Sequence, residues 1–148
     1  MRKIKFRADD GLKWIYSMTV DYDKDTDTYY MLDNTSHDNW IMCGNVGQYI
    51  GIKDKDGAEI YEGDFVEIEV KECALDGETE EHRKIFGSIE WNHGGFDIKV
   101  GTAHGASVYD TYTQEIKLSS DIISDEWKVV GNIYENPELL EESAWQNN

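Results

Sequence analysis

The sequence has 148 residues, 39% of them hydrophobic, and a formal charge of −17 from 14 basic and 31 acidic side chains. A chain of this length buries enough apolar surface for one globular core, so we predict a single domain over residues 1–148. The charge disfavours direct binding to nucleic acid or anionic lipid, because both need clustered Lys and Arg.

The N-terminal residues predict a β-hairpin. Apolar and basic residues alternate over residues 3–8, which is the period of a strand with one buried face. Asp9–Gly11 predicts a turn, because Asp tolerates turn geometry and Gly adopts positive φ. The returning strand places its larger apolar side chains at Leu12, Trp14 and Tyr16. We interpret the basic run as a solvated strand face, made of Arg2, Lys3, Lys5 and Arg7.

Residues 21–45 alternate between polar and apolar stretches. The segments 21–27 and 34–39 are polar and predict loops, whereas residues 29–32 and 40–43 predict short strands. The whole of Asp21–Asn45 has no recognisable motif, so whether it carries a site is open at this point.

The middle of the chain predicts three strands with two intervening turns. Residues 48–52 are rich in β-branched side chains, and Lys53–Gly57 predicts a turn with Gly57 in a left-handed conformation. A short strand at residues 59–61 and a turn at residues 62–64 follow. Residues 65–70 predict a half-buried strand, because apolar and acidic side chains alternate from Val66 to Val70.

The acidic segment Lys71–Arg83 predicts an exposed, mobile loop, and whether it carries a site is also open. After it, two alternating runs at residues 85–91 and 96–100 flank Asn92–Gly95, which predicts a hairpin. Weaker strands are predicted within residues 109–118 and at residues 127–130.

A short helix is predicted at the C-terminus. Asn136 is a favourable N-cap, Pro137 suits the first helical position, and Glu138 suits the helix dipole. The pattern as a whole predicts a mainly β fold: a small antiparallel, partly open barrel or bent sheets, with this short helix. A parallel sheet is disfavoured because strand–helix–strand units are absent.

Cys43 and Cys73 lie far apart and outside any C-x-x-C pair, which favours free thiols in a reducing cytoplasm. No apolar run is long enough to span a membrane, and the N-terminus lacks the apolar part of a secretory signal. We therefore expect the protein in the cytoplasm of the cell that makes it; the family resemblance described next implies that this is a bacterial host.

Three blocks of the sequence resemble the YopX-like proteins of phages and prophages. They are the opening residues 1–8, the turn-rich residues 49–64 and the closing residues 130–140, in the family's order. The chain departs from the family at Asp9, where a Trp is usual. The resemblance implies a phage or prophage origin, a mainly β fold and self-association. It implies no activity, substrate, cofactor or catalytic residue.

The acidic run at residues 21–27 is the first candidate metal site, because Asp21, Asp23, Asp25 and Asp27 recur at every second position. An EF-hand loop needs a Gly and a bidentate Glu at fixed positions. The frame that starts at Asp21 places Thr26 and Leu32 there, so the pattern favours a solvated turn.

Zinc needs several Cys, His or acidic ligands with paired spacing. The available residues are His37, His82, His93, His104, Cys43 and Cys73, and none of them forms such a pair. A structural metal site is therefore disfavoured, and we predict no metal and no cofactor.

Catalytic motifs are equally weak. Ser88 lies inside a predicted strand and outside any G-x-S-x-G motif, and Gly94–Gly95 predicts a hairpin turn and no phosphate loop. Glu62–Asp64 is explained by a turn in which Asp64 binds nearby backbone N–H groups. We predict no catalytic residue.

The sequence favours a non-enzymatic interaction or self-assembling module whose partner is a second copy or a host or phage protein. Aromatic residues supply much of the energy at protein interfaces, and the candidates here are Tyr29, Tyr30, Trp40 and Trp145. Two alternatives stay open. One is a small hydrolase or nucleotide-handling enzyme, and the other is an acidic mimic of nucleic acid that inhibits a host DNA-binding protein.

Overall fold

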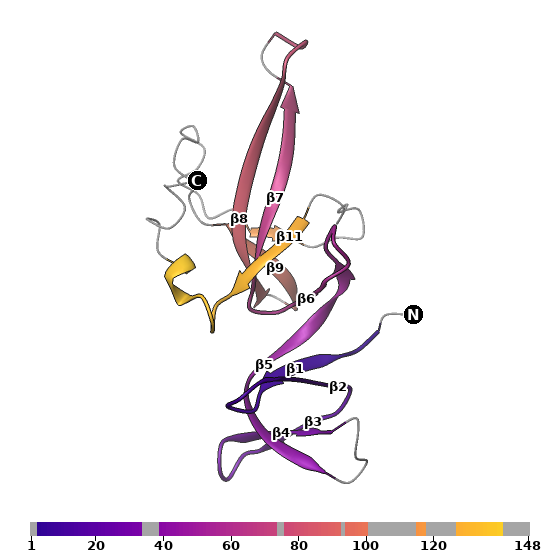
Figure 1. Ribbon diagram of the computed structural model, residues 1–148, viewed down its shortest axis with the longest axis vertical. Helices are drawn as coiled ribbons and strands as arrows, with labels where there is room; N and C mark the ends of the chain where they lie inside the picture. Colours follow the sequence, from indigo (N-terminus) through magenta and orange to yellow (C-terminus); the bar gives the residue numbers. More distant parts are fainter. Residues whose placement is uncertain are drawn as a thin grey trace. The chain divides into compact units, whose positions relative to one another are not determined.

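The computed structural model describes residues 3–33, 39–73, 76–92, 94–100, 115–117 and 127–140. These residues are mainly β-strand, as predicted (Figure 1). The chain forms two compact units, Met1–Ile52 and Lys53–Asn148, and each is built around an antiparallel sheet. None of the described helices is long and apolar enough to cross a membrane.

The sheet of the N-terminal unit has the strand order β2-β1-β5-β4-β3. Its strands are β1 (Phe6–Asp9), β2 (Trp14–Ser17), β3 (Val20–Asp23), β4 (Thr28–Leu32) and β5 (Trp40–Lys53). β2 contacts β4 although the two strands are not neighbours in this order. The sheet is therefore bent. Among the described strands no ladder closes the sheet into a barrel, so of the two predicted alternatives the bent sheet is the one that forms.

The predicted hairpin β1–β2 is confirmed, together with its turn. Asp9 Oδ1 accepts a hydrogen bond from the N–H of Gly11 at 2.7 Å, and Gly11 has φ of 94°. Asp10 Oδ1 accepts hydrogen bonds from the N–H groups of Leu12 and Lys13, at 2.8 and 2.9 Å. These short-range hydrogen bonds explain why the turn was visible in the sequence.

The faces of this hairpin differ from the prediction. Leu12 is 96% exposed, whereas Ser17 is buried at 2%. The register places Ala8 opposite Ile15 and Arg7 opposite Tyr16, and directly opposed residues of an antiparallel pair share a face. Ala8 is fully buried, so its face points to the core. Arg7, predicted to be solvated, is only 8% exposed.

Two further predictions in this unit are wrong. Residues 20–23 form strand β3 and not a polar loop, because Tyr22 pairs with Tyr29 and the turn is confined to residues 24–27. The strands predicted at residues 40–43 and 48–52 are one continuous strand, β5. Its register with β1 shifts near Asn45, whose φ of 52° lets the strand bulge without ending.

The sheet of the C-terminal unit has the order β10-β9-β8-β7-β11. Its strands are β7 (Asp64–Cys73), β8 (Glu80–Asn92), β9 (Gly95–Val100), β10 (Glu115–Lys117) and β11 (Trp127–Asn132), and β6 (Glu59–Tyr61) precedes them. Buried side chains of this unit include Ile60, Phe65, Val66, Phe86, Ile89, Ile98 and Trp127. The turn predicted at residues 62–64 and the hairpin predicted around Gly94 are confirmed, and Gly63 and Gly94 have φ of 88° and 82°.

Most of the predicted acidic loop Lys71–Arg83 is strand. The β7–β8 ladder continues from Glu69 opposite Lys84 to Cys73 opposite Glu80. The turn beyond it is held by Asp76 Oδ1, which accepts from the N–H groups of Glu78 and Thr79 at 2.9 Å each. Ladder hydrogen bonds join main-chain atoms, so a charged segment can continue a strand without an apolar face.

The predicted C-terminal helix is a 3-10 turn, η3 (Pro137–Leu140). The N–H of Leu139 donates to the carbonyl of Asn136 at 3.0 Å. Asn136 does not cap this turn as predicted, because its Oδ1 accepts from the N–H of Asn132 at 3.3 Å. Trp145 lies outside the described residues.

Candidate functional site

Exposed apolar side chains gather in the N-terminal unit. Eight of the large hydrophobic residues that the structure describes as exposed lie there: Ile4, Leu12, Tyr16, Met18, Tyr22, Tyr29, Trp40 and Met42. The described part of the C-terminal unit has three such exposed hydrophobic residues, Trp91, Val130 and Tyr134. Exposed apolar side chains mark candidate interaction sites where they adjoin one another on one face, so the faces of this sheet decide where such a site lies.

Four of the apolar side chains of β4 and β5 share one face of the sheet. Trp40 pairs with Leu32, and Met42 pairs with Tyr30. Alternation along both strands therefore puts the four side chains together, on the side opposite to Met31 and Ile41. We call these four residues the Trp40 face. Trp40 is 47% exposed and Met42 is 63% exposed.

The β1–β2 hairpin carries a row of cation–aromatic pairs. The Arg7 guanidinium lies 4.7 Å from the centroid of the Trp14 ring, and the Lys5 amine lies 5.3 Å from that of Tyr16. Lys5, which directly precedes β1, and Arg7 on β1 are two residues apart, so both contacts form on the same face. Burial of Arg7 is explained by this packing, because a guanidinium is weakly hydrated and stacks well on indole.

Tyr29 is exposed, as an interface residue should be, but it lies on the other face of the sheet. Its ring packs against that of Tyr22 with centroids 4.8 Å apart. The Tyr22 hydroxyl donates to Asp27 Oδ1 at 2.7 Å. This hydrogen bond, together with burial and the charge of Asp27, raises the pKa of Tyr22.

Cys43 lies opposite Tyr29 on the same face. Its Sγ approaches the carbonyl oxygen of Tyr29 at 3.6 Å. Burial and then the negative charge of Asp10 raise the pKa of this thiol. The thiolate is therefore disfavoured at neutral pH, and Cys43 is suited to packing and not to nucleophilic attack.

The candidate calcium residues do not converge. Asp21 Oδ1 accepts from the N–H of Tyr22 at 2.9 Å, and Asp23 Oδ1 accepts from the N–H of Asp25 at 2.9 Å. These carboxylates satisfy local N–H groups of a strand end and a turn. Within the described part of the chain, no three His, Cys, Asp or Glu side chains lie close enough to hold a metal ion.

Most of the candidate zinc residues lie outside the part of the chain whose side chains the structure describes. His37, His93, His104 and Trp145 lie outside the described residues, and the side chains of His82 and Cys73 are not described. Ser88 is buried at 4% exposure in β8, and its hydroxyl lies 3.3 Å from Glu90 Oε1.

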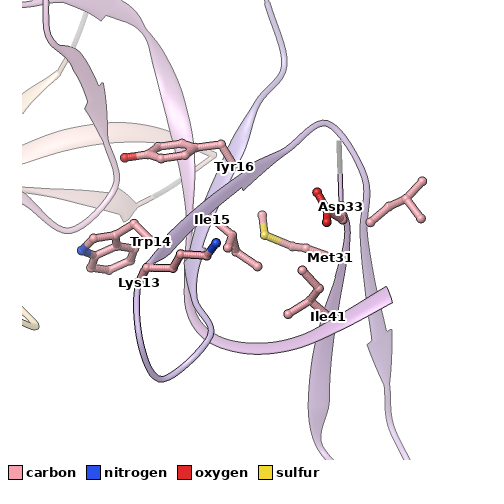
Figure 2. A pocket seen from close by; sticks show the side chains of 8 residues that line it. Lys13, Trp14, Ile15, Tyr16, Met31, Asp33 and Ile41 are labelled. Carbon is pink, nitrogen blue, oxygen red and sulfur yellow. The ribbon is translucent and has the colours of Figure 1, made fainter. Parts of the chain in front are cut away.

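A cavity of about 270 Å³ opens between strands of the N-terminal unit. Its apolar side chains include Ile15 of β2, Met31 of β4 and Ile41 of β5, which lie far apart in the sequence (Figure 2). The cavity exists because the bent sheet brings β2 across β4. Lys13 and Asp33 contribute opposite charges to its lining. Sequence reasoning missed this site, because its residues meet only in three dimensions.

The turn-rich block at residues 49–64 has a structural role. Asp54 Oδ1 accepts from the N–H groups of Asp56 and Ala58, at 2.9 and 2.8 Å. Gly57 has the predicted left-handed conformation, with φ of 85°. Asp64 Oδ2 accepts from the N–H of Tyr61 at 2.8 Å, as the sequence predicts for this turn. The carboxylates of this block are used to hold turns.

Charge is distributed unevenly between the two units. Residues 1–52 contain six basic and eight acidic side chains, for a formal charge of −2. Residues 53–148 contain eight basic and 23 acidic side chains, for a formal charge of −15. Most of the exposed large apolar side chains that the structure describes therefore lie on the nearly neutral unit, which exerts the weaker long-range electrostatic field.

Comparison with known proteins places the chain among its relatives. A family model described as "YopX protein" matches residues 5–141, which include parts of both compact units. The single YopX-like domain over residues 1–148 stays a prediction. Among solved structures, the chain is similar to the crystal structure of protein EF1440 from Enterococcus faecalis, with 23% identity and a TM-score of 0.47 over 95% of this chain and 100% of that one. No curated protein matches the chain.

Proposed function

The chain belongs to the YopX family, and on that premise we propose that it is a non-enzymatic interaction module of phage or prophage origin, which docks a protein on its Trp40 face. The partner is a second copy of the chain or a host or phage protein in the bacterial cytoplasm. The observation that carries this proposal is the joint exposure of Trp40 and Met42 on one side of the β4–β5 pair.

The composition of the Trp40 face suits protein docking. Aromatic residues and Met are enriched in the cores of interfaces, whereas charged residues are depleted there. Tyr30 and Leu32 are half-buried beside the two exposed side chains and complete an apolar centre. Asp21 lies opposite Tyr30 in the register and gives this centre an acidic border. An apolar centre with a polar rim is the usual anatomy of a binding surface.

The test compares a Trp40→Ser/Met42→Ser double variant with a Leu12→Ser control. Leu12 is more exposed than either residue but lies in the β1–β2 turn, so its replacement removes apolar surface elsewhere. Sedimentation velocity measures self-association, and affinity capture with quantitative mass spectrometry measures binding of host and phage proteins.

We expect the double variant to lose self-association, or to lose one defined captured protein, by at least about tenfold. The control should behave as the original chain. If the double variant keeps both the mass distribution and the captured proteins of the original chain, the proposal is wrong.

The uneven charge favours a second candidate, mimicry of nucleic acid by the acidic C-terminal unit. Its support is the formal charge of −15 on residues 53–148. A mimic should displace DNA from a host DNA-binding protein at low salt and lose this effect as salt screens the charges. The Trp40→Ser/Met42→Ser variant should retain the displacement. A failure to displace DNA from any host protein that the chain binds would exclude this candidate.

A further inference from the structure

We propose that the cavity of the N-terminal unit binds a small zwitterion with an apolar side chain, such as a single free amino acid. The cavity lies on the Met31 side of the β4–β5 pair and shares only Leu32 with the Trp40 face, so this proposal does not depend on the function proposed above. The cavity lies inside one compact unit, and all of its lining residues are described.

The apolar part of the cavity selects for an aliphatic or aromatic group. Ile15, Met31 and Ile41 contribute side chains from three strands, and Figure 2 shows all three pointing into the same space. Met31 is only 1% exposed, so it forms a fixed floor. Pockets lined mainly by apolar side chains, with a few placed polar groups, are the common form of small-molecule sites.

The size of the cavity limits the ligand. A volume of about 270 Å³ has room for about nine groups of the size of a water molecule. One amino acid of medium size fits this space.

The two charged lining residues select for a zwitterion. Figure 2 shows the Lys13 side chain extending towards Ile15, and the Asp33 carboxylate on the other side of Met31. A ligand with only a carboxylate is attracted by Lys13 but repelled by Asp33. A ligand with only an amine is attracted by Asp33 but repelled by Lys13. A molecule with both groups pairs with both residues, and charge-assisted hydrogen bonds of this kind are the stronger ones.

The cavity can accept a ligand without rearrangement of the core. It lies where β2 crosses β4 without a hydrogen-bonded ladder between them, so opening it breaks no backbone pairing among the described strands. A ligand that bridges Lys13, next to β2, and Asp33, next to β4, would join the two edges of the bend.

The test uses L-leucine, L-methionine and L-phenylalanine as probes of the full-length chain. Methyl resonances of Ile15, Met31 and Ile41 report binding at the cavity in two-dimensional NMR titrations. We expect saturable shifts with at least one probe. The matched compounds 4-methylpentanoate and isopentylamine, which carry one charge each, should bind at least about tenfold more weakly.

Variants separate a specific site from general apolar partitioning. Lys13→Met and Asp33→Asn should each weaken binding by about tenfold or more. The controls Lys24→Met and Asp25→Asn change the same residue types in the β3–β4 turn and should leave the affinity unchanged. Folding of each variant is checked by the dispersion of its own NMR spectrum.

Two results would overturn the proposal. One is the absence of methyl shifts with all three amino acids at concentrations up to about 20 mM, because weaker binding lies below the affinity expected for two charge pairs. The other is equal binding of the singly charged compounds, which would show an apolar cavity without recognition of charge.

Discussion

The carboxylate of Asp54 joins the turn after β5 to the distant strand β11, because its Oδ2 accepts a hydrogen bond from the N–H of Val129 at 2.9 Å, across 75 residues. Its Oδ1 holds the turn of residues 54–58 at the same time. The N–H of Lys55 also donates to the carbonyl of Trp127, at 2.9 Å. One buried side chain therefore fixes this turn against β11.

Replacement of Asp54 is expected to destabilise the C-terminal unit. Asp54→Ala removes three acceptor contacts to buried or half-buried N–H groups, and we expect a loss of about 3 kcal/mol in the free energy of unfolding. Asp56→Ala removes an exposed carboxylate from the same turn and should change the value by less than about 0.5 kcal/mol. Urea denaturation of the two variants and the original chain measures the difference. Equal losses in the two variants would contradict the assigned role of Asp54.

The same carboxylate predicts a dependence of stability on pH. Burial raises the pKa of Asp54, but hydrogen bonds from Val129, Ala58 and Asp56 lower it, and the net shift is downward. The stabilisation is thus complete above the unfolded pKa of about 3.9 and is lost as the pH falls through the lower folded value. We expect Asp54→Ala to show a smaller loss of stability than the original chain in urea denaturation between about pH 5 and pH 2.

Gly63 and Gly57 allow the cost of a side chain to be separated from the cost of the backbone conformation. Both have φ above 80°, but a Cβ at Gly63 would lie 3.1 Å from Tyr134 Cε2, whereas a Cβ at Gly57 meets no atom within 4 Å. We expect Gly57→Ala to cost about 1–2 kcal/mol and Gly63→Ala about 1 kcal/mol more. Thermal denaturation provides the measurement. Tyr134→Ala should recover the additional loss at Gly63, and no recovery would rule out the proposed contact.

The two cation–aromatic pairs of the β1–β2 hairpin are expected to differ in strength. A double-mutant cycle with Arg7→Met and Trp14→Leu should give a coupling energy of about 1–2 kcal/mol, because Arg7 is largely desolvated. The cycle with Lys5→Met and Tyr16→Leu should give about 0.5 kcal/mol, because Tyr16 is exposed. A larger coupling at the exposed pair would contradict this explanation of the burial of Arg7.

Asp27 is expected to control the ionisation of Tyr22. The Asp27→Asn variant keeps a side-chain oxygen but removes the negative charge, so the raised pKa of Tyr22 should fall towards the ordinary value of about 10. NMR titration of the Tyr22 ring measures the change. Asp25→Asn, in the same turn, should leave the pKa unchanged, and an equal effect of both variants would indicate a general field effect.

The β7–β8 hairpin should exchange its amide hydrogens unevenly. Near its base, β7 is also paired with β11 and β8 with β9, whereas the described strands leave residues 69–73 and 80–84 paired only with each other. Two strands alone are marginally stable in water. We expect hydrogen–deuterium exchange to be at least about tenfold faster in residues 69–73 than in residues 65–68. Uniform protection along β7 would show that something else covers the distal half.

Local chemistry made much of the fold predictable. The turns at Gly11, Gly57 and Gly63 were visible because Asp and Gly carry their own conformational preferences. The sequence failed where tertiary pairing decides the structure. Strand β3 was missed because its acidic residues suggest a loop, and the pairing of Tyr22 with Tyr29 overrides that preference.

The candidate sites also include residues that their type alone made predictable and features that only the folded structure reveals. Trp40 and Tyr30 were predicted as interface residues from their type alone, and the structure places both on one face of the sheet. The burial of Arg7 and the cavity at Ile15 depend on register and on the bend of the sheet. Neither can be read from alternation along one strand, because alternation does not state which face lies inward.

The contact between Asp54 and β11 has a consequence for synthesis on the ribosome. The turn of residues 54–58 is translated long before Val129, so its anchoring partner is absent while most of the C-terminal unit emerges. One edge of β7 also stays unpaired until β11 has been synthesised. An incomplete chain therefore exposes an unpaired strand edge, and a stalled or truncated product is expected to be a target for chaperones and proteases.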